Sequence, residues 1–221
     1  MMKHVTFLQH LILIFCGVLL TSTVLAKGPP PETTHDGLVL KRDSKVAVVY
    51  VNPEADFSQY KKIQILDVYV AFKKHWKREH RVSKGDMDRI KRRAAELFRN
   101  VFVEVLEEGG YPVVYENGED VLLVRPAIID LDITAPDTMK AGRSRTYAAN
   151  AGAATLYIEL FDSNTSAILA RAIDRKAGRS HYGSWRMTGT SVYNSAEARK
   201  ILKNWATLLM GALDSAQGKT N

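Results

Sequence analysis

Between residues 46 and 72, a continuous apolar run and then a stretch with the two-residue period of β-strands predict two strands. The run Val46 to Val51 is apolar and β-branched, so it predicts a buried strand that ends at the turn-forming residues 52–56. A second strand is expected from Lys62 to Phe72, but its apolar side chains change from one face to the other at Leu66. We therefore expect a bulge or a change of burial near Leu66.

Two later stretches have the three- and four-residue spacing of amphipathic helices. The first is predicted to begin at Ser83, which resembles the start of a capping box with Asp86, and to end at Gly109-Gly110. The second is predicted to begin at Asn194, with Glu197 three residues further on. Its apolar stripe consists of Ile201, Trp205, Leu208 and Ala212.

Turn-forming residues divide the chain between these helices into strands. Tyr111 to Tyr115 predicts a short strand, and Asn117-Gly118 after it favours the tight turn of a hairpin. Val121 to Thr134 predicts a longer strand, in which Pro126 cannot donate a hydrogen bond to a neighbour. We expect this strand to be bent at Pro126 or to lie at a sheet edge there.

The clearest hairpin pattern lies further on, where strands around Leu156 to Leu160 and Ala167 to Arg175 flank the turn Asp162 to Thr165. The order of elements is strand, strand, helix, several strands and helix, which predicts an α+β fold. We expect a two-layer sandwich, in which a mainly antiparallel sheet carries both amphipathic helices on one face. A single domain over residues 38–215 is predicted, with a flexible tail at 216–221.

The first 26 residues have the pattern of a secretory signal peptide. Lys3 precedes an apolar run from Leu11 to Leu20, and Ala26 ends a small-residue cleavage site. The run is shorter than the about 20 residues of a transmembrane helix, so cleavage is expected to leave no transmembrane span. Residues 27–37 contain three consecutive prolines and predict an extended tether. The predicted location is periplasmic or otherwise exported.

The single cysteine, Cys16, lies inside this apolar run. Lipid anchoring is not expected, because Phe15 stands where a small residue should precede a lipidated cysteine and the apolar run continues beyond it. After cleavage the chain would have no cysteine, which excludes a disulfide, a thiolate metal site and a cysteine nucleophile. Serine-nucleophile, phosphate-loop and dinucleotide motifs are also absent from the sequence.

Basic residues outnumber acidic ones by 31 to 24, for a formal net charge of +7. A positive charge favours acidic partners, such as anionic lipid, lipopolysaccharide, peptidoglycan or nucleic acid. Nucleic acid is disfavoured, because the export signal directs the protein away from the cytoplasm.

Several segments resemble a known family when they are taken together in order. They are Asp56 to Lys62, Ala151 to Leu156, Glu159 to Ser163 and Ile168 to Ala172, the last followed by Asp174-Arg175. Their sequence is similar to that of the domain of unknown function 3313 family, bacterial envelope proteins often described as lipoproteins. The resemblance spans roughly Leu38 to Leu213, and implies an exported protein with no established activity.

A dense basic cluster at residues 73–81 surrounds Trp76. Such a cluster can bind phosphate-rich surfaces, with the indole at a membrane interface or stacked on a base or sugar. The alternative is a solvated loop in which Trp76 closes the core. The loops 136–154 and 176–194 carry further basic and aromatic residues of the kind that anchor interfaces, although Trp185 and Tyr193 would equally plug the core. The candidate partner surface comprises Lys73, Lys74, Trp76, Lys77, Arg78, Arg143, Arg145, Tyr182, Trp185 and Arg186.

Other polar residues give little indication of catalysis. His75 and His80 have a spacing that zinc sites use, but further ligands are not evident. Asp130 and Asp132 alternate with apolar residues, as on a wet sheet face, and Asp174 is expected to pair with its neighbour Arg175. We expect no cofactor and no enzymatic activity.

The sequence therefore favours a non-enzymatic module that binds or scaffolds an envelope partner, such as a protein, peptidoglycan or anionic lipid. One alternative is a carrier of a small amphipathic ligand, which would need a sizeable apolar cavity between sheet and helices. A hydrolase is the third class, retained because carboxylates are present.

Overall fold

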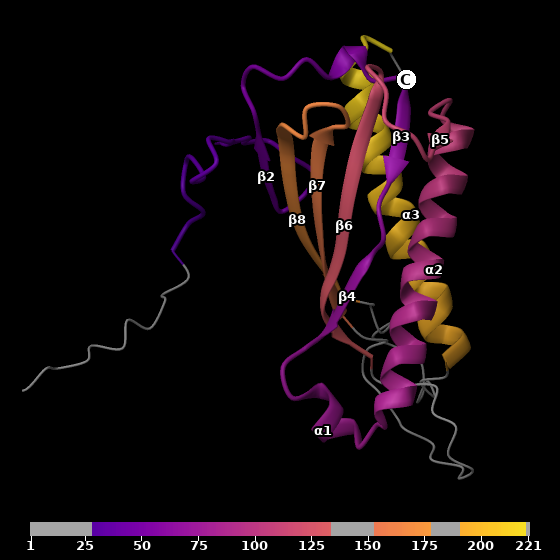
Figure 1. Ribbon diagram of the computed structural model, residues 1–221. Helices are drawn as coiled ribbons and strands as arrows, with labels where there is room; N and C mark the ends of the chain where they lie inside the picture. Colours follow the sequence, from indigo (N-terminus) through magenta and orange to yellow (C-terminus); the bar gives the residue numbers. More distant parts are fainter. Residues whose placement is uncertain (1–27, 134–152, 178–190, 220–221) are drawn as a thin grey trace, which may run out of the picture.

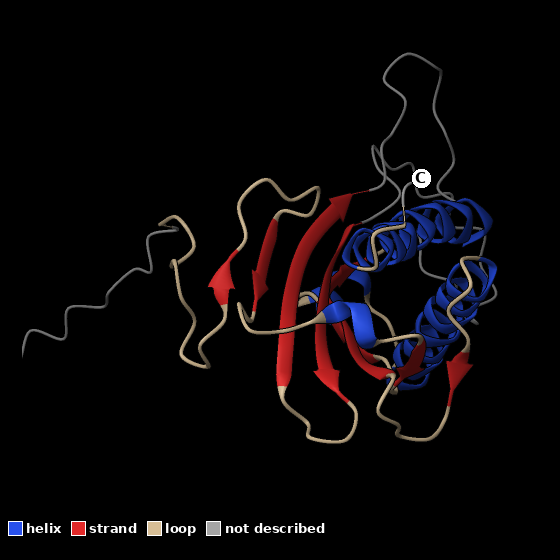
Figure 2. Ribbon diagram, turned by 90° about the horizontal axis from the view of Figure 1, so that it is seen from above, coloured by secondary structure: helices blue, strands red, loops and turns tan. Residues whose placement is uncertain are grey.

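The computed structural model describes residues 28–133, 153–177 and 191–219. They form one mixed sheet of eight strands, with two long helices packed on one of its faces (Figures 1 and 2). The predicted α+β sandwich is thereby confirmed. The strands are β1 (Val39–Leu40), β2 (Val48–Val51), β3 (Lys62–Ile65), β4 (Tyr69–Phe72), β5 (Val113–Val114), β6 (Val121–Asp132), β7 (Ala153–Asp162) and β8 (Ile168–Ala177), and the helices are η1 (Phe57–Gln59), α1 (Trp76–His80), α2 (Lys84–Glu108) and α3 (Ser191–Ala216).

The strand order is β1-β2-β8-β7-β6-β3-β5, and β4 also pairs with β6. The run from β1 to β6 is antiparallel, as predicted, but β3 and β4 pair with β6 in parallel, and β5 pairs with β3 in parallel. These parallel pairs arise because α1 and α2 carry the chain from β4 back to the start of β5, so that it does not reverse in a hairpin.

The strand expected from Lys62 to Phe72 is split in two. β3 pairs with the first part of β6 and β4 with a later part, and the interruption lies at residues 66–68. Pro126 lies opposite this interruption. Leu66 N donates to Val124 O (2.9 Å), so the backbone groups of Val124 point towards the β3 side of β6. Those of Pro126, two residues later, point to the same side and therefore face the interruption. A proline without an N–H is therefore tolerated in a central strand, since no neighbouring strand accepts from it there.

The hairpin predicted at Asn117-Gly118 is wrong, because β3 lies between β5 and β6. The turn there is instead tied to the hairpin of β7 and β8, since Gly118 N donates to Ser163 Oγ (3.0 Å) and that hydroxyl donates back to Gly118 O (2.9 Å). The hairpin predicted between β7 and β8 is confirmed by their antiparallel register.

Both predicted amphipathic helices are present. Ser83 caps α2, because its hydroxyl oxygen accepts from Asp86 N (3.1 Å) and its proton is donated to the Asp86 carboxylate (2.8 Å). The helix ends at Gly109, and Gly110 follows it with a left-handed φ of 82°. α3 begins at Ser191, three residues before the predicted cap Asn194.

The core lies between the sheet and these two helices. α2 and α3 pack side by side, and α2 contributes two phenylalanines stacked with ring centroids 3.9 Å apart. Trp205 of α3 donates from Nε1 to the buried Asp174 of β8 (2.7 Å). Asp174 also pairs with Lys176 (2.9 Å), so the expected pair with Arg175 is wrong: Asp174 points towards the helices and its sequence neighbour points the other way. The fully buried apolar side chains of this core include Ile63, Phe98, Phe102, Leu122, Val124 and Ala206.

The last residues of the segment expected to be a tether lie against the domain. Tyr50 of β2 donates its hydroxyl proton to Pro31 O (3.0 Å), and Asp36 accepts from the guanidinium of Arg171 on β8 (3.2 Å to Nη1). Within the three described ranges, no helix is both long enough and apolar enough to span a bilayer.

Candidate functional site

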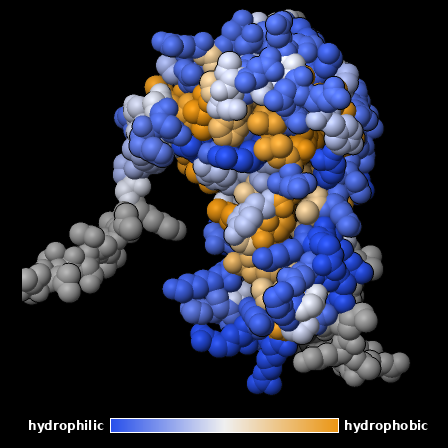
Figure 3. Space-filling view, in the orientation of Figure 1, coloured by the Kyte–Doolittle hydropathy of each residue, from blue (hydrophilic) through white to orange (hydrophobic). Residues whose placement is uncertain are grey.

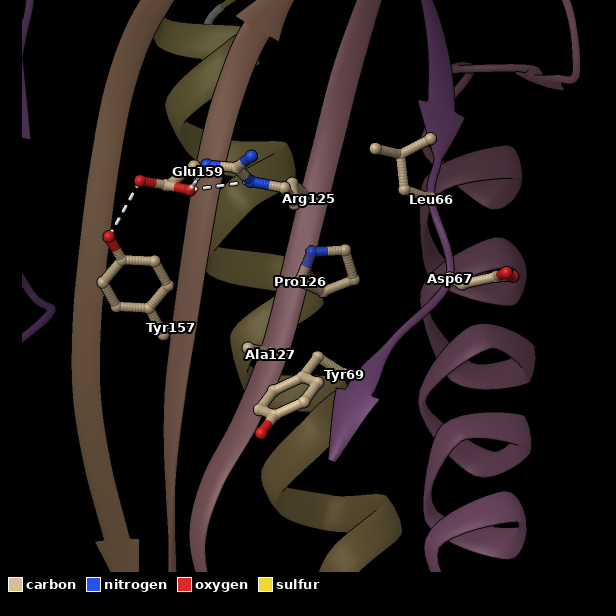
Figure 4. Close-up of a pocket in the computed structure, with 8 residues that line it drawn as sticks. All are labelled: Leu66, Asp67, Tyr69, Arg125, Pro126, Ala127, Tyr157 and Glu159. Carbon is tan, nitrogen blue, oxygen red and sulfur yellow. Dashed lines mark hydrogen bonds and ion pairs between the residues drawn. The ribbon is translucent and has the colours of Figure 1, made fainter. Parts of the chain in front are cut away.

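A concavity of about 470 Å³ lies on the open face of the sheet, the face that α2 and α3 leave uncovered. In Figure 1, α3 runs behind the sheet and α2 stands beside its β3 edge, so the open face is towards the viewer. Figure 3 shows apolar surface exposed on this side of the molecule. The concavity spans the interruption between β3 and β4, the middle of β6 and part of β7 (Figure 4). Its lining residues are Leu66, Asp67, Tyr69, Arg125, Pro126, Ala127, Tyr157 and Glu159.

One row of side chains across the strands creates the hollow. Tyr69 of β4 is paired with Ala127 of β6, and Ala127 is paired in turn with Tyr157 of β7. Paired residues of adjacent strands project to the same face, so a methyl group stands between two phenol rings. The interruption at residues 66–68 widens the space beside Ala127, since no regular strand occupies it.

Tyr69 is unusual because it is a large aromatic residue left 64% exposed. Most large apolar side chains of this domain are buried, and an exposed aromatic ring beside a hollow is typical of a binding surface. Tyr157 is only partly exposed, and its hydroxyl donates to Glu159 Oε1 (2.8 Å). The concavity therefore has one accessible ring and one ring fixed in place.

A second row, one step along the strands, is charged. Glu159 of β7 stands between Arg125 of β6 and Arg171 of β8, and its side chain is only 5% exposed. Arg171 Nε donates to Glu159 Oε1 (3.0 Å), and Arg125 Nε donates to Glu159 Oε2 (2.8 Å). A buried carboxylate with charge-assisted bonds on both oxygens is firmly oriented.

These contacts also set the ionisation of the carboxylate. Burial by itself raises the pKa of Glu159, but the hydrogen bonds from Arg125, Tyr157 and Arg171 outweigh it and hold the pKa below its usual value. Burial, followed by the bond to Glu159, raises the pKa of Tyr157. Glu159 is therefore ionised at neutral pH, whereas a general acid needs a carboxyl whose pKa is raised.

Asp36 completes the charged row from the N-terminal side. It accepts from Arg171, and this hydrogen bond, helped by that from Thr34, holds the pKa of Asp36 well below its usual range. The negative charges of Asp36 and Glu159 are thus balanced by the positive charges of Arg125 and Arg171. Arg125 remains the accessible member, with a side chain 56% exposed and packed over the Phe161 ring at 4.7 Å. Its exposed guanidinium edge can donate to a ligand in the concavity.

The structure shows where the basic cluster of the candidate partner surface lies. Residues 76–80 form the short helix α1 where the alternative interpretation expected a loop. Trp76 is fully buried and stacks on Phe72 at 4.2 Å, so its inclusion in an accessible partner surface is corrected: the indole closes the core. Lys73, Lys74, Lys77 and Arg78 remain exposed around it.

The remaining candidates, Arg143, Arg145, Tyr182, Trp185 and Arg186, lie outside the described residues. Among the residues that are described, no group of three or more histidine, cysteine, aspartate or glutamate side chains could hold a metal ion. The structure brings together Arg125, Tyr157 and Glu159 with Tyr69, none of which the sequence selected. Alternation of polar and apolar residues in β7 indicated that Tyr157 and Glu159 share one face of the sheet. Which residues of β6 and β8 lie beside them could not be predicted without the strand register.

The chain belongs to the family described as "Protein of unknown function (DUF3313)", whose model matches residues 35–209. The match includes every residue of the concavity and of its charged row. No curated protein matches the chain.

Distant similarities to solved structures cover most of the domain. A PelC dodecamer from Paraburkholderia phytofirmans is 12% identical, with a TM-score of 0.41, over 72% of this chain and 96% of that chain. A DUF330 protein from Xanthomonas campestris is 13% identical, with a TM-score of 0.36, over 75% and 93%. A DUF4136 family protein from Bacteroides thetaiotaomicron is 11% identical, with a TM-score of 0.34, over 78% and 97%.

Proposed function

We propose that this protein is an exported, non-enzymatic binding module of the cell envelope. It binds a macromolecular partner on the open face of its sheet, where one apolar unit of that partner enters the concavity between Tyr69 and Tyr157. Arg125 at the rim donates to an acceptor on the same unit. The observation that carries this proposal is the exposed Tyr69 ring beside a hollow floored by Ala127.

The other face of the sheet supports binding at the surface over carriage in the interior. A carrier of a small amphipathic ligand would hold it between sheet and helices. There, side chains from both layers, such as Phe98, Phe102 and Leu122, are already fully buried against one another. The concavity on the open face is apolar with a few directed polar groups, which is the usual composition of a ligand site.

The ionisation of the charged row favours binding over hydrolysis. Glycoside hydrolysis and similar reactions need one carboxyl with a raised pKa near one that is ionised. Glu159 has a lowered pKa and both of its oxygens are already bonded to arginines or Tyr157. The row instead fixes Tyr157 and Arg125 in the positions they need for recognition.

Site-directed photo-crosslinking in living cells tests the proposal. A photoreactive phenylalanine analogue in place of Tyr69 is expected to capture a specific envelope component. The matched control places the same analogue at Tyr115, which is also largely exposed (78%) and lies outside the concavity. Equal capture from both positions, or capture from neither, would contradict the assignment of the site.

Two further measurements separate the parts of the proposal. Ala127→Leu fills the floor of the hollow, and we expect it to abolish capture while the fold is retained. Native mass spectrometry of protein purified from the periplasm should show the mass of a chain that begins at Lys27. A mass that includes residues 1–26 would argue against the predicted cleavage, and an added small-molecule mass that survives Ala127→Leu would favour the carrier.

A further inference from the structure

The end of the molecule formed by α1 carries exposed cations that the concavity does not use. We call Lys74, Lys77, Arg78 and Arg81 the basic cap; all four are exposed. They lie on or directly beside α1, which projects beyond the end of β4 at the bottom of Figure 1. The surface at this end is strongly hydrophilic in Figure 3.

The basic cap is held rigidly although α1 has only five residues. Trp76 anchors it: its ring is stacked between Phe72 at 4.2 Å and His80 at 4.6 Å, and its Nε1 donates to Ile133 O (3.3 Å). Val82, immediately after the helix, is also buried. The cations are therefore presented by a fixed part of the domain.

The backbone at both ends of α1 adopts a conformation that favours glycine. His75 has a φ of 68° and Arg81 a φ of 50°, and each is in the left-handed region although it carries a β-carbon. Such residues are strained and are found where the surrounding structure enforces them. The two left-handed residues bend the chain sharply into and out of α1, so that the helix protrudes.

Within the part of the chain that the structure describes, the charges of the basic cap are not balanced locally. Neighbouring Lys73 pairs with Asp132 (3.1 Å), and Lys84 pairs with Asp88 (3.0 Å). In contrast, the four cations of the basic cap have no ion-pair partner among the described residues. Glu79 is the only acidic side chain of α1. An uncompensated group of like charges at one end of a domain attracts an anionic surface.

We propose that the basic cap docks on the anionic headgroups of a lipid bilayer. Its cations spread over the outside of a protruding turn, a shape that meets a flat array of anions better than it surrounds one compact anion. Each Lys or Arg held near an anionic bilayer strengthens binding by roughly fivefold. The attraction falls off within about 10 Å, so it acts on this end of the molecule and orients the sheet relative to the membrane.

Sedimentation with lipid vesicles tests this docking. The mature protein is expected to pellet with vesicles of phosphatidylglycerol and phosphatidylcholine, and not with phosphatidylcholine alone. The triple variant Lys74→Gln, Lys77→Gln and Arg78→Gln is expected to lower the partition coefficient by roughly a hundredfold. Arg81 is left unchanged because of its left-handed backbone, and a melting curve verifies that the variant is folded.

A matched control removes the same charge elsewhere. Lys41, Lys45 and Lys61 are exposed and lie between β1 and β2 or just before β3, away from α1. Their triple change to Gln should leave most of the binding intact. The docking would be overturned if the control lost as much binding as the cap variant, if the unaltered protein did not pellet, or if it pelleted with isolated peptidoglycan instead of vesicles. Loss of Tyr69 crosslinking would leave this result unaffected, because the two sites are separate.

Discussion

The two faces of the sheet use the same strands for opposite purposes. On β7, Leu156 and Ile158 point to the helices and are buried in the core, whereas Tyr157 and Glu159 point to the open face. On the helix side, α2 and α3 form a second layer that removes the apolar side chains of the sheet from water. On the open side the described residues form no second layer, and charged and aromatic side chains cover one another.

Polar groups are also satisfied differently on the two faces. Asp174, on the helix side, is buried and bonded by Trp205 and Lys176. Glu159, on the open side, joins a row of charges that crosses three strands and reaches Asp36 of the N-terminal segment. The comparison shows that a sheet face without a helical layer can be ordered by ion pairs, and that such a face retains room for a ligand. Four changes test it, in order of decreasing effect.

Phe102→Ala should have the largest effect. The side chain is fully buried and stacked on Phe98, so its removal leaves a cavity between sheet and helices. We expect the free energy of unfolding to fall by about 3–5 kcal/mol. Denaturant unfolding followed by circular dichroism measures the change. A loss below about 1 kcal/mol would mean that the helix side is not the main source of stability.

Glu159→Gln tests the open face. The change leaves two guanidiniums facing a neutral amide in a site where the native carboxylate is 5% exposed. We expect a loss of about 3 kcal/mol in the same unfolding measurement. The control is Arg125→Gln: its side chain is 56% exposed, so we expect a loss of at most about 1 kcal/mol. Equal losses of stability in the two variants would show that the buried Glu159 stabilises the charged row no more than the exposed Arg125 does.

Asp36→Asn tests the end of the row through its pH dependence. The folded pKa of Asp36 lies well below the ordinary value of 3.8, because Arg171 bonds the ionised form. The stabilisation is therefore fully present above that ordinary value and is lost as the pH falls from it through the lowered folded pKa. We expect the substitution to cost about 2 kcal/mol at neutral pH and progressively less in acid.

Urea unfolding at a series of pH values measures the difference between the unaltered chain and the Asp36→Asn variant. A difference that stays constant from neutral pH down into the acid range would show that the stabilising contact does not require the charge of Asp36.

Tyr69→Ala should have the smallest effect on stability. Its ring is 64% exposed and covers no part of the helix-side core, so the free energy of unfolding should change by about 0.5 kcal/mol or less. Thermal unfolding measures this, with Tyr115→Ala as the matched exposed tyrosine. A loss of about 2 kcal/mol at Tyr69 would assign it a role in packing instead of binding.

Much of the fold could be predicted from local patterns. The amphipathic stripe and the Ser83 cap predicted α2, and the turn Asp162 to Thr165 predicted the hairpin of β7 and β8. Even the switch of faces at Leu66 indicated the interruption between β3 and β4. The hairpin predicted from Asn117-Gly118 was wrong, because turn residues indicate a change of chain direction and do not specify which strand becomes the neighbour.

The candidate site was not accessible to this kind of reasoning. The basic cluster was visible as a run of charges. The burial of Trp76, however, depends on Phe72 at the end of β4 and on Ile133 just after β6. The concavity depends on three residues from three strands, and its central member is an alanine, which has no chemical signal of its own. A hollow is defined by the absence of side-chain atoms, and only the register of neighbouring strands reveals it.

The sequence by itself determined the α+β class, both ends of α2 and the hairpin of β7 and β8, because these follow from patterns and interactions of residues near one another in the chain. The tertiary structure alone decided that β3 and β4 join β6 in parallel, that Glu159 lies between two arginines, and that Tyr69 faces Tyr157 across Ala127. These contacts join residues that are far apart in sequence. They depend on the register between the strands, because paired residues of adjacent strands project to the same face of the sheet.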